Sequence, residues 1–262
     1  MTRQKETIYY YSDPLHDDFG PSPRKIKMIA GSYRYNRDKW LYKLFDFISY
    51  RVVMTPIALI YIKLFRRIKI VNRNLLKVVR KEGVIIYANH THAQADAFGP
   101  TVYAFPKNVN IVVNPTNVSL PVIGNLTKSW GALPLPDDYE AGKRFLKEVG
   151  NRLAMKRVVL IYPEAHLWPF YTHIRPFTSQ SFTYPLKYAV KTYALTTTYQ
   201  TKRNGKLKTV VYIDGPFIAE KGLSQKDAAS KLRDEVYEAM TRRAQMSTYE
   251  KIKYVAMEKK AL

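Results

Sequence analysis

The chain has 262 residues, of which 46% are hydrophobic, so it can form a sizeable core and is not an intrinsically disordered protein. Its 43 lysines and arginines against 21 aspartates and glutamates give a net charge of +22, which predicts a polyanionic partner such as nucleic acid, an anionic lipid surface or a phosphorylated substrate. The absence of cysteine excludes disulfides, thiolate catalysis and cysteine-ligated metals, and fits a reducing compartment.

Residues 1–38 are polar, with scattered proline, glycine and aspartate. This composition predicts an extended N-terminal arm that packs on the surface or orders late in folding. The arm contains no apolar region of the kind that a secretory signal has, so we expect the protein on the cytoplasmic side of any membrane that it binds.

Residues 39–70 have a different character. Trp40, Leu44 and Ile48 belong to an apolar stripe with helical spacing, and an uncharged apolar run follows at 52–62, with Pro56 as an expected kink. As a helix this run would cover about 16 Å, roughly half of the hydrocarbon thickness of a membrane. With cations at both ends, the segment predicts a pair of amphipathic helices in the interface of an anionic membrane. The alternative is a helix pair packed on the protein's own core.

From residue 71 to residue 262 the pattern predicts one α/β domain. Buried strands are expected at 84–88, 109–113, 158–162 and 210–214, and helices near 118–130, 140–154, 181–191 and 224–245. Strands that alternate with helices indicate a mostly parallel central sheet flanked by helices. Active sites in such sheets lie beyond the carboxyl ends of the strands, and two polar clusters fall at such positions.

The first polar cluster is residues 89–96, directly after the expected strand 84–88. Histidine is the natural general base near neutral pH, and His90 has a carboxylate nearby in Asp96. A carboxylate on the second ring nitrogen fixes the tautomer and stabilises the imidazolium. No serine or cysteine nucleophile is needed if the hydroxyl of an acceptor substrate attacks an acyl group itself. The alternative interpretation is a loop with two solvated histidines.

The second polar cluster is residues 162–169, after the expected strand 158–162, and it continues to Arg175. Glu164 follows an apolar strand and a proline, a place where a carboxylate without a partner is costly. We therefore expect Glu164 either to hold a substrate hydroxyl or to tie two loops together. A purely structural role, in which the carboxylate caps backbone amides, is the alternative.

Together the two clusters resemble the glycerolipid and lysophospholipid acyltransferase family. The first block of this family is N-H-x-x-x-x-D at the end of a strand, and Asn89, His90 and Asp96 match its residue types. Here five residues separate histidine from aspartate in place of four. His92 with Asp96 is an alternative register with three residues between them. We prefer His90, because YANH continues from the strand as it does in the family.

The other blocks of the family are matched less completely. In the third block, F-P-E-G-T-R, the first three positions correspond to Tyr162, Pro163 and Glu164, while the arginine is missing at Leu167. The second block lacks its arginine, the fourth is faintly echoed by YALTTTY, and the resemblance spans about residues 40–215. Further matched positions are Gly124, Lys128 and Gly131 of the second block, and Pro176, Phe177 and Phe182 downstream of the third.

The resemblance implies a membrane-associated O-acyltransferase of phospholipid synthesis. His90 would deprotonate the acceptor hydroxyl and Asp96 would orient the ring, while Glu164, Arg175 and Lys128 would bind the acceptor. The expected acceptor is a lysophospholipid, 1-acylglycerol 3-phosphate, and the acyl donor is acyl-CoA or acyl-carrier protein as co-substrate. No cofactor and no metal are implied.

Two other functions remain open from the sequence. A basic nucleic-acid-binding protein would explain the charge and the 21 tyrosines. Because the basic residues are spread along the whole chain and form no known nucleic-acid module, we expect no nucleic acid among the partners. A catalytically divergent family member that only binds membranes would explain the altered spacing and the missing arginines.

Overall fold

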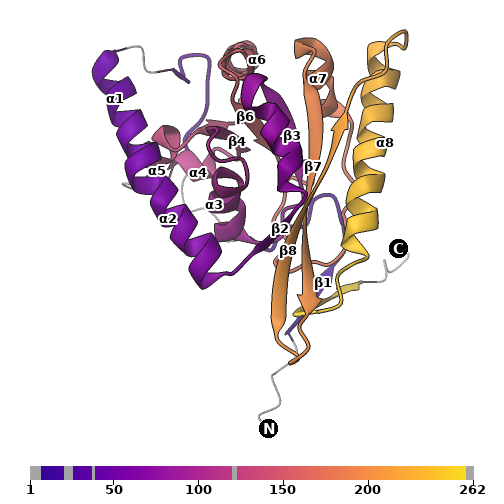
Figure 1. The fold of residues 1–262 in the computed structure, drawn as a ribbon. Coiled ribbons are helices and arrows are strands. Elements are labelled where there is room, and N and C mark those ends of the chain that lie inside the picture. The colour runs from indigo at the N-terminus through magenta and orange to yellow at the C-terminus, as the bar shows by residue number, and fades with distance from the viewer. Residues whose placement is uncertain (1–6, 21–25, 37–38, 120–122, 258–262) are drawn as a thin grey trace.

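The computed structural model describes residues 7–20, 26–36, 39–119 and 123–257. A seven-stranded sheet with helices on both faces forms the body of the molecule, and a two-stranded ribbon lies beside it (Figure 1). The predicted α/β class with a mostly parallel sheet is confirmed, because among its neighbouring strands only β7 (Lys191–Thr201) and β8 (Leu207–Phe217) run antiparallel.

The central strands of the sheet are apolar on both faces. Every residue of β3 (Val84–Ala88) and β6 (Val158–Ile161) is buried, as expected for parallel strands covered by helices on two sides. The strand order across the sheet is β2 (Lys69–Val71), β8 (Leu207–Phe217), β7 (Lys191–Thr201), β3 (Val84–Ala88), β6 (Val158–Ile161), β4 (Val109–Val113) and β5 (Ala132–Pro134).

Two apolar clusters hold the helices on the sheet. One cluster contains α3 (Ala93–Tyr103) and one side of the N-terminal helix, and the other contains α6 (Tyr139–Ala154) and α8 (Gln225–Ala244). The helices α6 and α8 are preceded by the N-cap residues Asp138 and Ser224, whose side chains accept a backbone N–H of the first turn. The remaining helices are a 3₁₀ helix at Arg73–Lys81, α4 (Thr116–Ser119), α5 (Ile123–Ser129), a 3₁₀ turn at Gln180–Phe182 and α7 (Thr183–Tyr188).

Most of the predicted elements of the α/β domain are present. Strands 84–88 and 109–113 have the predicted ends, 158–162 ends one residue earlier, and 210–214 is the middle of the longer β8. The helix expected near 181–191 stops at Tyr188, because Ala189 adopts a left-handed conformation with φ of 49°. The region expected as one helix near 118–130 contains the two short helices α4 and α5, and residues 120–122 lie outside the described part.

The predicted pair of N-terminal helices is wrong in one respect, because residues Trp40–Phe65 form a single continuous helix labelled α1 (Trp40–Ile48) and α2 (Thr55–Ile60) (Figure 1). The turns before Pro56 are π-helical, and the N–H of Thr55 bonds to the carbonyl of Tyr50, five residues earlier. The hydroxyl of Thr55 donates to the same carbonyl at 2.7 Å. We attribute the continuity to these wider turns, which accommodate the proline ring.

Because the helix is continuous, the apolar segment is longer than the run at 52–62 predicted. The apolar run at 52–62 alone is too short to span a membrane, but the 26 residues of Trp40–Phe65 cover about 39 Å. By length and composition the helix is apolar enough to cross a membrane. Its first nine residues bury no side chain, whereas further along Tyr50, Met54 and Ile62 are buried against the domain.

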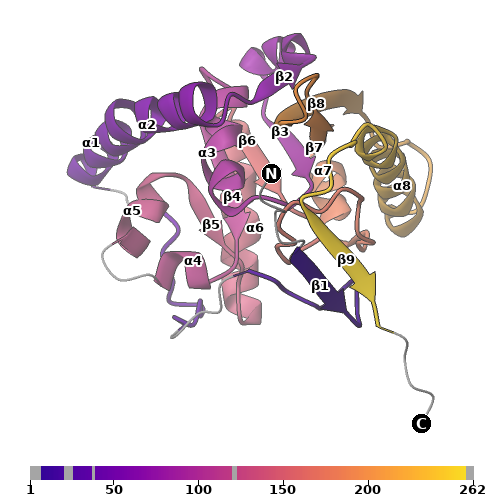
Figure 2. The same ribbon diagram turned by 90° about the horizontal axis from the view of Figure 1, so that it is seen from below.

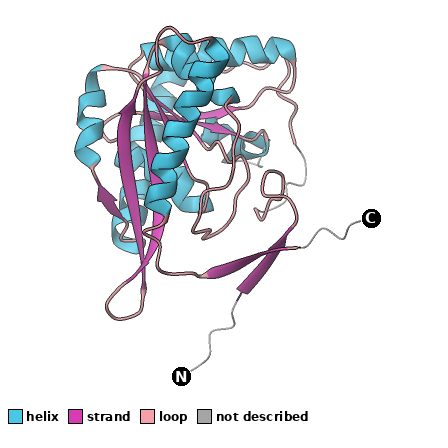
Figure 3. Cartoon of the chain, turned by 90° about the vertical axis from the view of Figure 1, so that its right-hand side faces the viewer, coloured by secondary structure: helices cyan, strands magenta, loops and turns pink. Residues whose placement is uncertain are grey.

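The N-terminal arm pairs with the C-terminal end of the described chain. Strand β1 (Thr7–Tyr11) pairs in parallel with β9 (Ile252–Ala256), and the ribbon lies beside the loops at one end of the sheet (Figures 2 and 3). Trp168 stacks on Tyr254 with ring centroids 4.9 Å apart, and Phe19 of the arm packs against both rings. The sequence patterns did not indicate these two strands.

Candidate active site

The carboxyl end of strand β3 is fixed by the first residue after it. The side chain of Asn89 accepts the N–H of Thr197 at 2.8 Å and donates to the carbonyl of the same residue at 3.0 Å. The amide thus continues the pairing of β3 with β7 by one position through a side chain. It sets the direction in which the chain leaves the sheet, and His90 follows immediately.

His90 and Asp96 are in direct contact. Nδ1 of His90 lies 2.8 Å from Oδ2 of Asp96, and the same oxygen accepts the backbone N–H groups of Thr91 at 3.0 Å and His92 at 2.8 Å. Asp96 stands in the first turn of α3 and is 6% exposed. Three donors converge on one buried oxygen, so the loop between the two residues is folded around the carboxylate. This compact loop accommodates the five intervening residues.

His92 has a different place in the same loop. It is the N-cap of α3, and its Nδ1 accepts the N–H of Ala95 at 3.3 Å. Burial lowers the pKa of His92, which favours the neutral ring that this acceptor role needs. Of the two registers that the sequence left open, the structure puts the ring of His90 on the carboxylate of Asp96 and uses the ring of His92 to cap the helix.

Tyr162 holds the ring of His90 from the neighbouring strand end. The two rings are stacked with centroids 4.5 Å apart, and the Tyr162 hydroxyl donates to the backbone carbonyl of Asp96 at 2.7 Å. Burial, with the negative charge of Asp96, raises the pKa of Tyr162 well above its usual value, so the phenol keeps its proton. From the sequence, Tyr162 was recognised only as the aromatic residue of a motif, and no pattern indicated its contact with His90.

Glu164 ties the two strand-end loops together by accepting backbone amides, which agrees with one of the roles predicted from its sequence position and also with the structural alternative, while its binding of an acceptor remains a prediction. One carboxylate oxygen accepts the backbone N–H of His90 at 2.9 Å and the other accepts that of Arg175 at 2.9 Å. The carboxyl is only 3% exposed. Burial raises the pKa of Glu164, and the nearby guanidinium and the two amide donors oppose that rise.

The structure does not fit the prediction that Arg175 binds the acceptor. Its side chain is 1% exposed, and Nη2 lies 3.7 Å from the carboxylate of Glu164. The guanidinium also donates to the carbonyls of His166 and Pro14 and lies over the ring of Trp168 at 5.0 Å. Because protein groups surround this cation, it cannot reach a substrate in this conformation. Its position supports a structural role, as the counter-charge of a buried glutamate.

Lys128 lies on α5, where its Nζ is 4.0 Å from the ring centroid of Tyr33 in the N-terminal arm. It is not among the residues that line the cavity beside His90, although the preceding Thr127 is. The acceptor-binding role of Lys128 therefore remains a prediction.

A cavity of about 610 Å³ opens beside His90 and Asp96. Its volume is within the range of sites that enclose a small organic ligand. The described residues that line it include no lysine or arginine. Its apolar part includes Met54 of the N-terminal helix, Phe98, Ile111, Val113, Trp130 and Leu135, and its polar part includes Asn114, Asn117, Gln180 and His166.

His166 is the second histidine of this cavity. Its Nδ1 lies 3.5 Å from the carboxylate of Asp18 in the N-terminal arm, and its side chain is 33% exposed. From the sequence, His166 was noted only as a departure from the third block of the family motif. Its place at the wall of the cavity depends on the turn at Ala165, which has φ of 62°, and no pattern in the sequence indicates that turn.

The fold and the site define a class of enzyme: an acyltransferase in which a histidine and a buried carboxylate stand at a strand end beside an apolar cavity. The family model described as Acyltransferase matches residues 67–197, which is half of the chain. The chain belongs to this acyltransferase family, as the motifs indicated.

A solved structure supports the fold. The crystal structure of the 1-acyl-sn-glycerophosphate (LPA) acyltransferase PlsC from Thermotoga maritima is similar with a TM-score of 0.55 at 16% sequence identity. The match covers 80% of this chain and 90% of that chain. At this identity the likeness concerns the fold. A comparison with curated protein sequences gives no match.

Proposed function

We propose that this enzyme moves a fatty acyl group from a thioester donor, acyl-CoA or acyl-carrier protein, to the hydroxyl of a lysophospholipid at a membrane surface. The acceptor that we propose is 1-acylglycerol 3-phosphate, in phospholipid synthesis. The observation that carries the proposal is the contact between His90 and Asp96 at the end of a largely apolar cavity. This arrangement supplies a base for a hydroxyl and a space for an acyl chain.

The proposed reaction begins with proton transfer to His90. Its Nδ1 faces Asp96, so Nε2 is the nitrogen that is left to accept the proton of the acceptor hydroxyl. The oxygen then attacks the thioester carbonyl carbon, and the tetrahedral intermediate collapses with cleavage of the carbon–sulfur bond. The imidazolium returns the proton to the leaving thiolate. Asp96 stabilises the imidazolium while it exists and keeps the ring in one tautomer.

The oxyanion of the intermediate requires hydrogen-bond donors. Helix α3 begins at Ala93, which lines the cavity, and the first N–H groups of a helix have no partner within the helix. They also carry the positive end of the helix dipole. We therefore assign the oxyanion to the amino-terminal turn of α3, between the base and the apolar part of the cavity.

An acyl-transfer assay tests this proposal. Purified protein is mixed with vesicles that contain lysophosphatidate and with a long-chain acyl-CoA or, in a parallel reaction, an acyl-carrier protein thioester, and the diacyl product is measured by mass spectrometry. Monoacylglycerol in the same vesicles serves as the matched neutral acceptor. We expect transfer to lysophosphatidate. Faster transfer to monoacylglycerol would contradict the proposed acceptor but would support acyl transfer as the reaction. No transfer from acyl-CoA or acyl-carrier protein to either acceptor would indicate a catalytically divergent protein.

The helix Trp40–Phe65 supports attachment to the membrane in the plane of the interface. Tyr50, Met54 and Ile62 lie on its buried side, so the helix packs along the domain. A helix that spanned the bilayer in this position would draw the polar domain into the hydrocarbon, which is costly. Its outer side is apolar and exposed over its whole length, including Trp40, Leu41, Phe45, Val52, Val53, Ile57, Ile60, Leu64 and Phe65. This face matches an interfacial helix with an anionic leaflet as the partner.

Substitutions on the outer face of the helix should weaken attachment. Val52 is 62% exposed and Leu64 is 65% exposed. We expect Val52→Ser and Leu64→Ser each to weaken binding to vesicles, because burial of such a side chain contributes about 1.5–3 kcal/mol, or roughly tenfold or more in affinity. Ile218→Ser is the matched control, since Ile218 is 63% exposed on another part of the surface.

Vesicle sedimentation at low and high salt measures this effect. High salt should release only part of the wild-type protein, because screening weakens the charge contribution and leaves the apolar contribution. Complete release by salt, with no effect of Val52→Ser or Leu64→Ser, would show that attachment is purely electrostatic and would contradict the role of the helix.

A further inference from the structure

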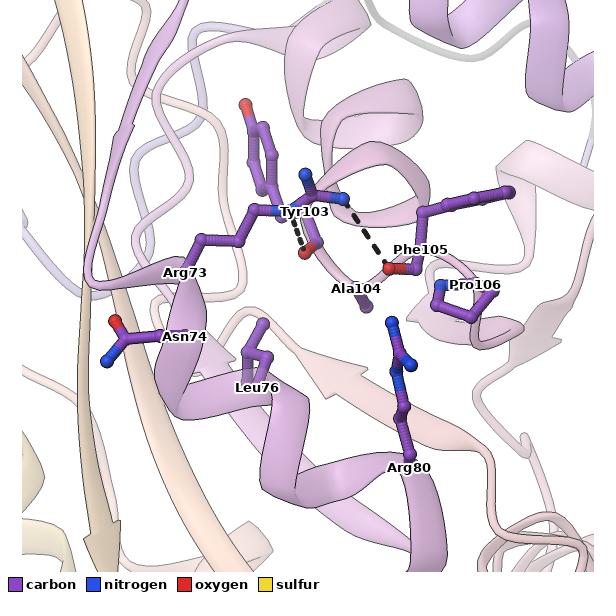
Figure 4. Close-up of a pocket in the computed structure, with 8 residues that line it drawn as sticks. All are labelled: Arg73, Asn74, Leu76, Arg80, Tyr103, Ala104, Phe105 and Pro106. Carbon is purple, nitrogen blue, oxygen red and sulfur yellow. Dashed lines mark hydrogen bonds between the residues drawn. The ribbon is translucent and has the colours of Figure 1, made fainter.

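A second cavity, of about 620 Å³, lies at the end of α3 that is remote from His90. The helix has 11 residues, so about 16 Å separates its two ends. The cavity is enclosed by the 3₁₀ helix Arg73–Lys81 and by the turn that follows α3 (Figure 4). Its lining residues are Arg73, Asn74, Leu76, Arg80, Tyr103, Ala104, Phe105 and Pro106, which include two cations and no carboxylate.

Arg73 is fixed at the carboxyl end of α3. Its Nε donates to the carbonyl of Tyr103 at 3.3 Å, and Nη2 donates to that of Val102 at 3.2 Å and that of Phe105 at 3.5 Å. These carbonyls carry the negative end of the helix dipole, and a cation beside them is stabilised. The contacts orient the guanidinium, and no carboxylate of the described residues forms an ion pair with it.

Arg80 and Arg51 complete a group of cations around the same turn. In Figure 4 the side chain of Arg80 extends from the 3₁₀ helix toward Ala104 and Pro106. Arg51, from the N-terminal helix, donates to the carbonyl of Pro106. Within the described ranges, no ion pair involves Arg51, Arg73 or Arg80.

The rim of the cavity is apolar where it meets the N-terminal helix. Phe105 is 45% exposed, and the guanidinium of Arg51 lies 5.9 Å from its ring centroid. Beside Arg51 on the helix, Val52 and Val53 are exposed. The basic cavity is thus continuous with the surface that we propose to lie in the membrane interface.

We propose that this cavity binds the headgroup of an anionic phospholipid of that membrane. The phosphate diester lies against the guanidinium of Arg80, with Arg73 behind it, and the acyl chains pass over Phe105 toward the outer face of the N-terminal helix. Charge-assisted contacts suit the phosphate and the apolar rim suits the chains. A soluble phosphate would gain only the first of these contributions. The proposal rests on the membrane attachment that we propose above, and the site is separate from the one that holds the substrates.

Charge reversal at Arg80 tests the proposal in the full-length protein. Arg80→Glu is compared with Arg203→Glu, which makes the same change of charge at an exposed residue of the turn between β7 and β8. We measure binding to vesicles of phosphatidylcholine with and without phosphatidylglycerol. Arg80→Glu should weaken binding to the anionic vesicles about tenfold more than Arg203→Glu, as expected for loss of one charged hydrogen bond. Arg80→Gln should show a smaller loss of the same kind.

A spectroscopic measurement locates the lipid independently. Phe105→Trp places a fluorophore at the rim, and brominated phosphatidylglycerol should quench it more than brominated phosphatidylcholine does, with the difference lost on Arg80→Glu. Equal losses in the two charge-reversed variants, or quenching that is independent of the headgroup, would overturn the site and leave membrane attachment intact. Displacement of the lipid by coenzyme A or glycerol phosphate would also overturn it, because the cavity would then hold a soluble phosphate. Failure of the wild-type protein to bind either kind of vesicle would instead remove the membrane attachment on which the site depends.

Discussion

Replacement of His90 by alanine is expected to lower acyl transfer by about 10²–10⁴-fold, the usual loss when a general base is removed. Asp96→Asn should lower turnover by a similar factor, because an amide can support the wrong tautomer of the ring and does not stabilise the imidazolium. The donor and acceptor concentrations at half-maximal rate should change much less than the turnover number, since neither substitution removes the cavity. Steady-state kinetics of the two variants measure both quantities.

His92→Asn is the matched control for this prediction. Asparagine is a good N-cap residue, so this variant keeps the acceptor for the N–H of Ala95 and removes the second imidazole of the loop. We expect most of the activity to remain. If His92→Asn abolished transfer while His90→Ala retained it, the base would be His92, and the contact between His90 and Asp96 would be structural.

The second large effect concerns stability. Glu164→Gln should reduce the free energy of unfolding by about 3–5 kcal/mol, the usual cost when one partner of a buried ion pair is removed. The physical reason is that Arg175 remains in the interior, 1% exposed, without its counter-charge. Urea denaturation followed by circular dichroism measures the change.

The double variant Glu164→Gln/Arg175→Met separates this cause from the loss of hydrogen bonds. Methionine fills part of the space of the arginine without a charge, so the double variant should be more stable than Glu164→Gln alone. A single variant that unfolds at the wild-type midpoint would mean that the pair contributes nothing. If the double variant were less stable than Glu164→Gln, packing of the arginine side chain would matter more than its charge.

The sequence predicted the centre of the sheet and the contact between His90 and Asp96 for a physical reason. Strands such as 84–88 are buried on both faces, so nearly every residue is apolar and the pattern is strong. The polar residues directly after such a strand must lie at the edge of the sheet, and His90 therefore faces the same region as Glu164. Their contact through a backbone N–H follows from the pairing of β3 with β6.

Other features depend on contacts that a local pattern does not contain. The burial of Arg175 depends on Pro14 of the N-terminal arm as well as on Glu164 and Trp168 of the loop after β6, and the contact with the arm spans 161 residues. Proline at position 56 normally predicts a kink, and only the π-helical turns around it allow the helix to continue. Strand β1 was missed because its partner β9 lies almost a whole chain length away and both are short and partly exposed.

The pairing of β1 with β9 makes the loop after β6 depend on two strands that lie outside the central sheet. The backbone N–H of Trp168 donates to the carbonyl of His90 at 3.2 Å, and the ring of Trp168 stacks on Tyr254 of β9. A short ribbon with partly exposed strands is the kind of element that opens locally while a buried sheet stays folded. Opening of this ribbon would therefore uncover Trp168, and with it the segment beside His90, without unfolding of the domain.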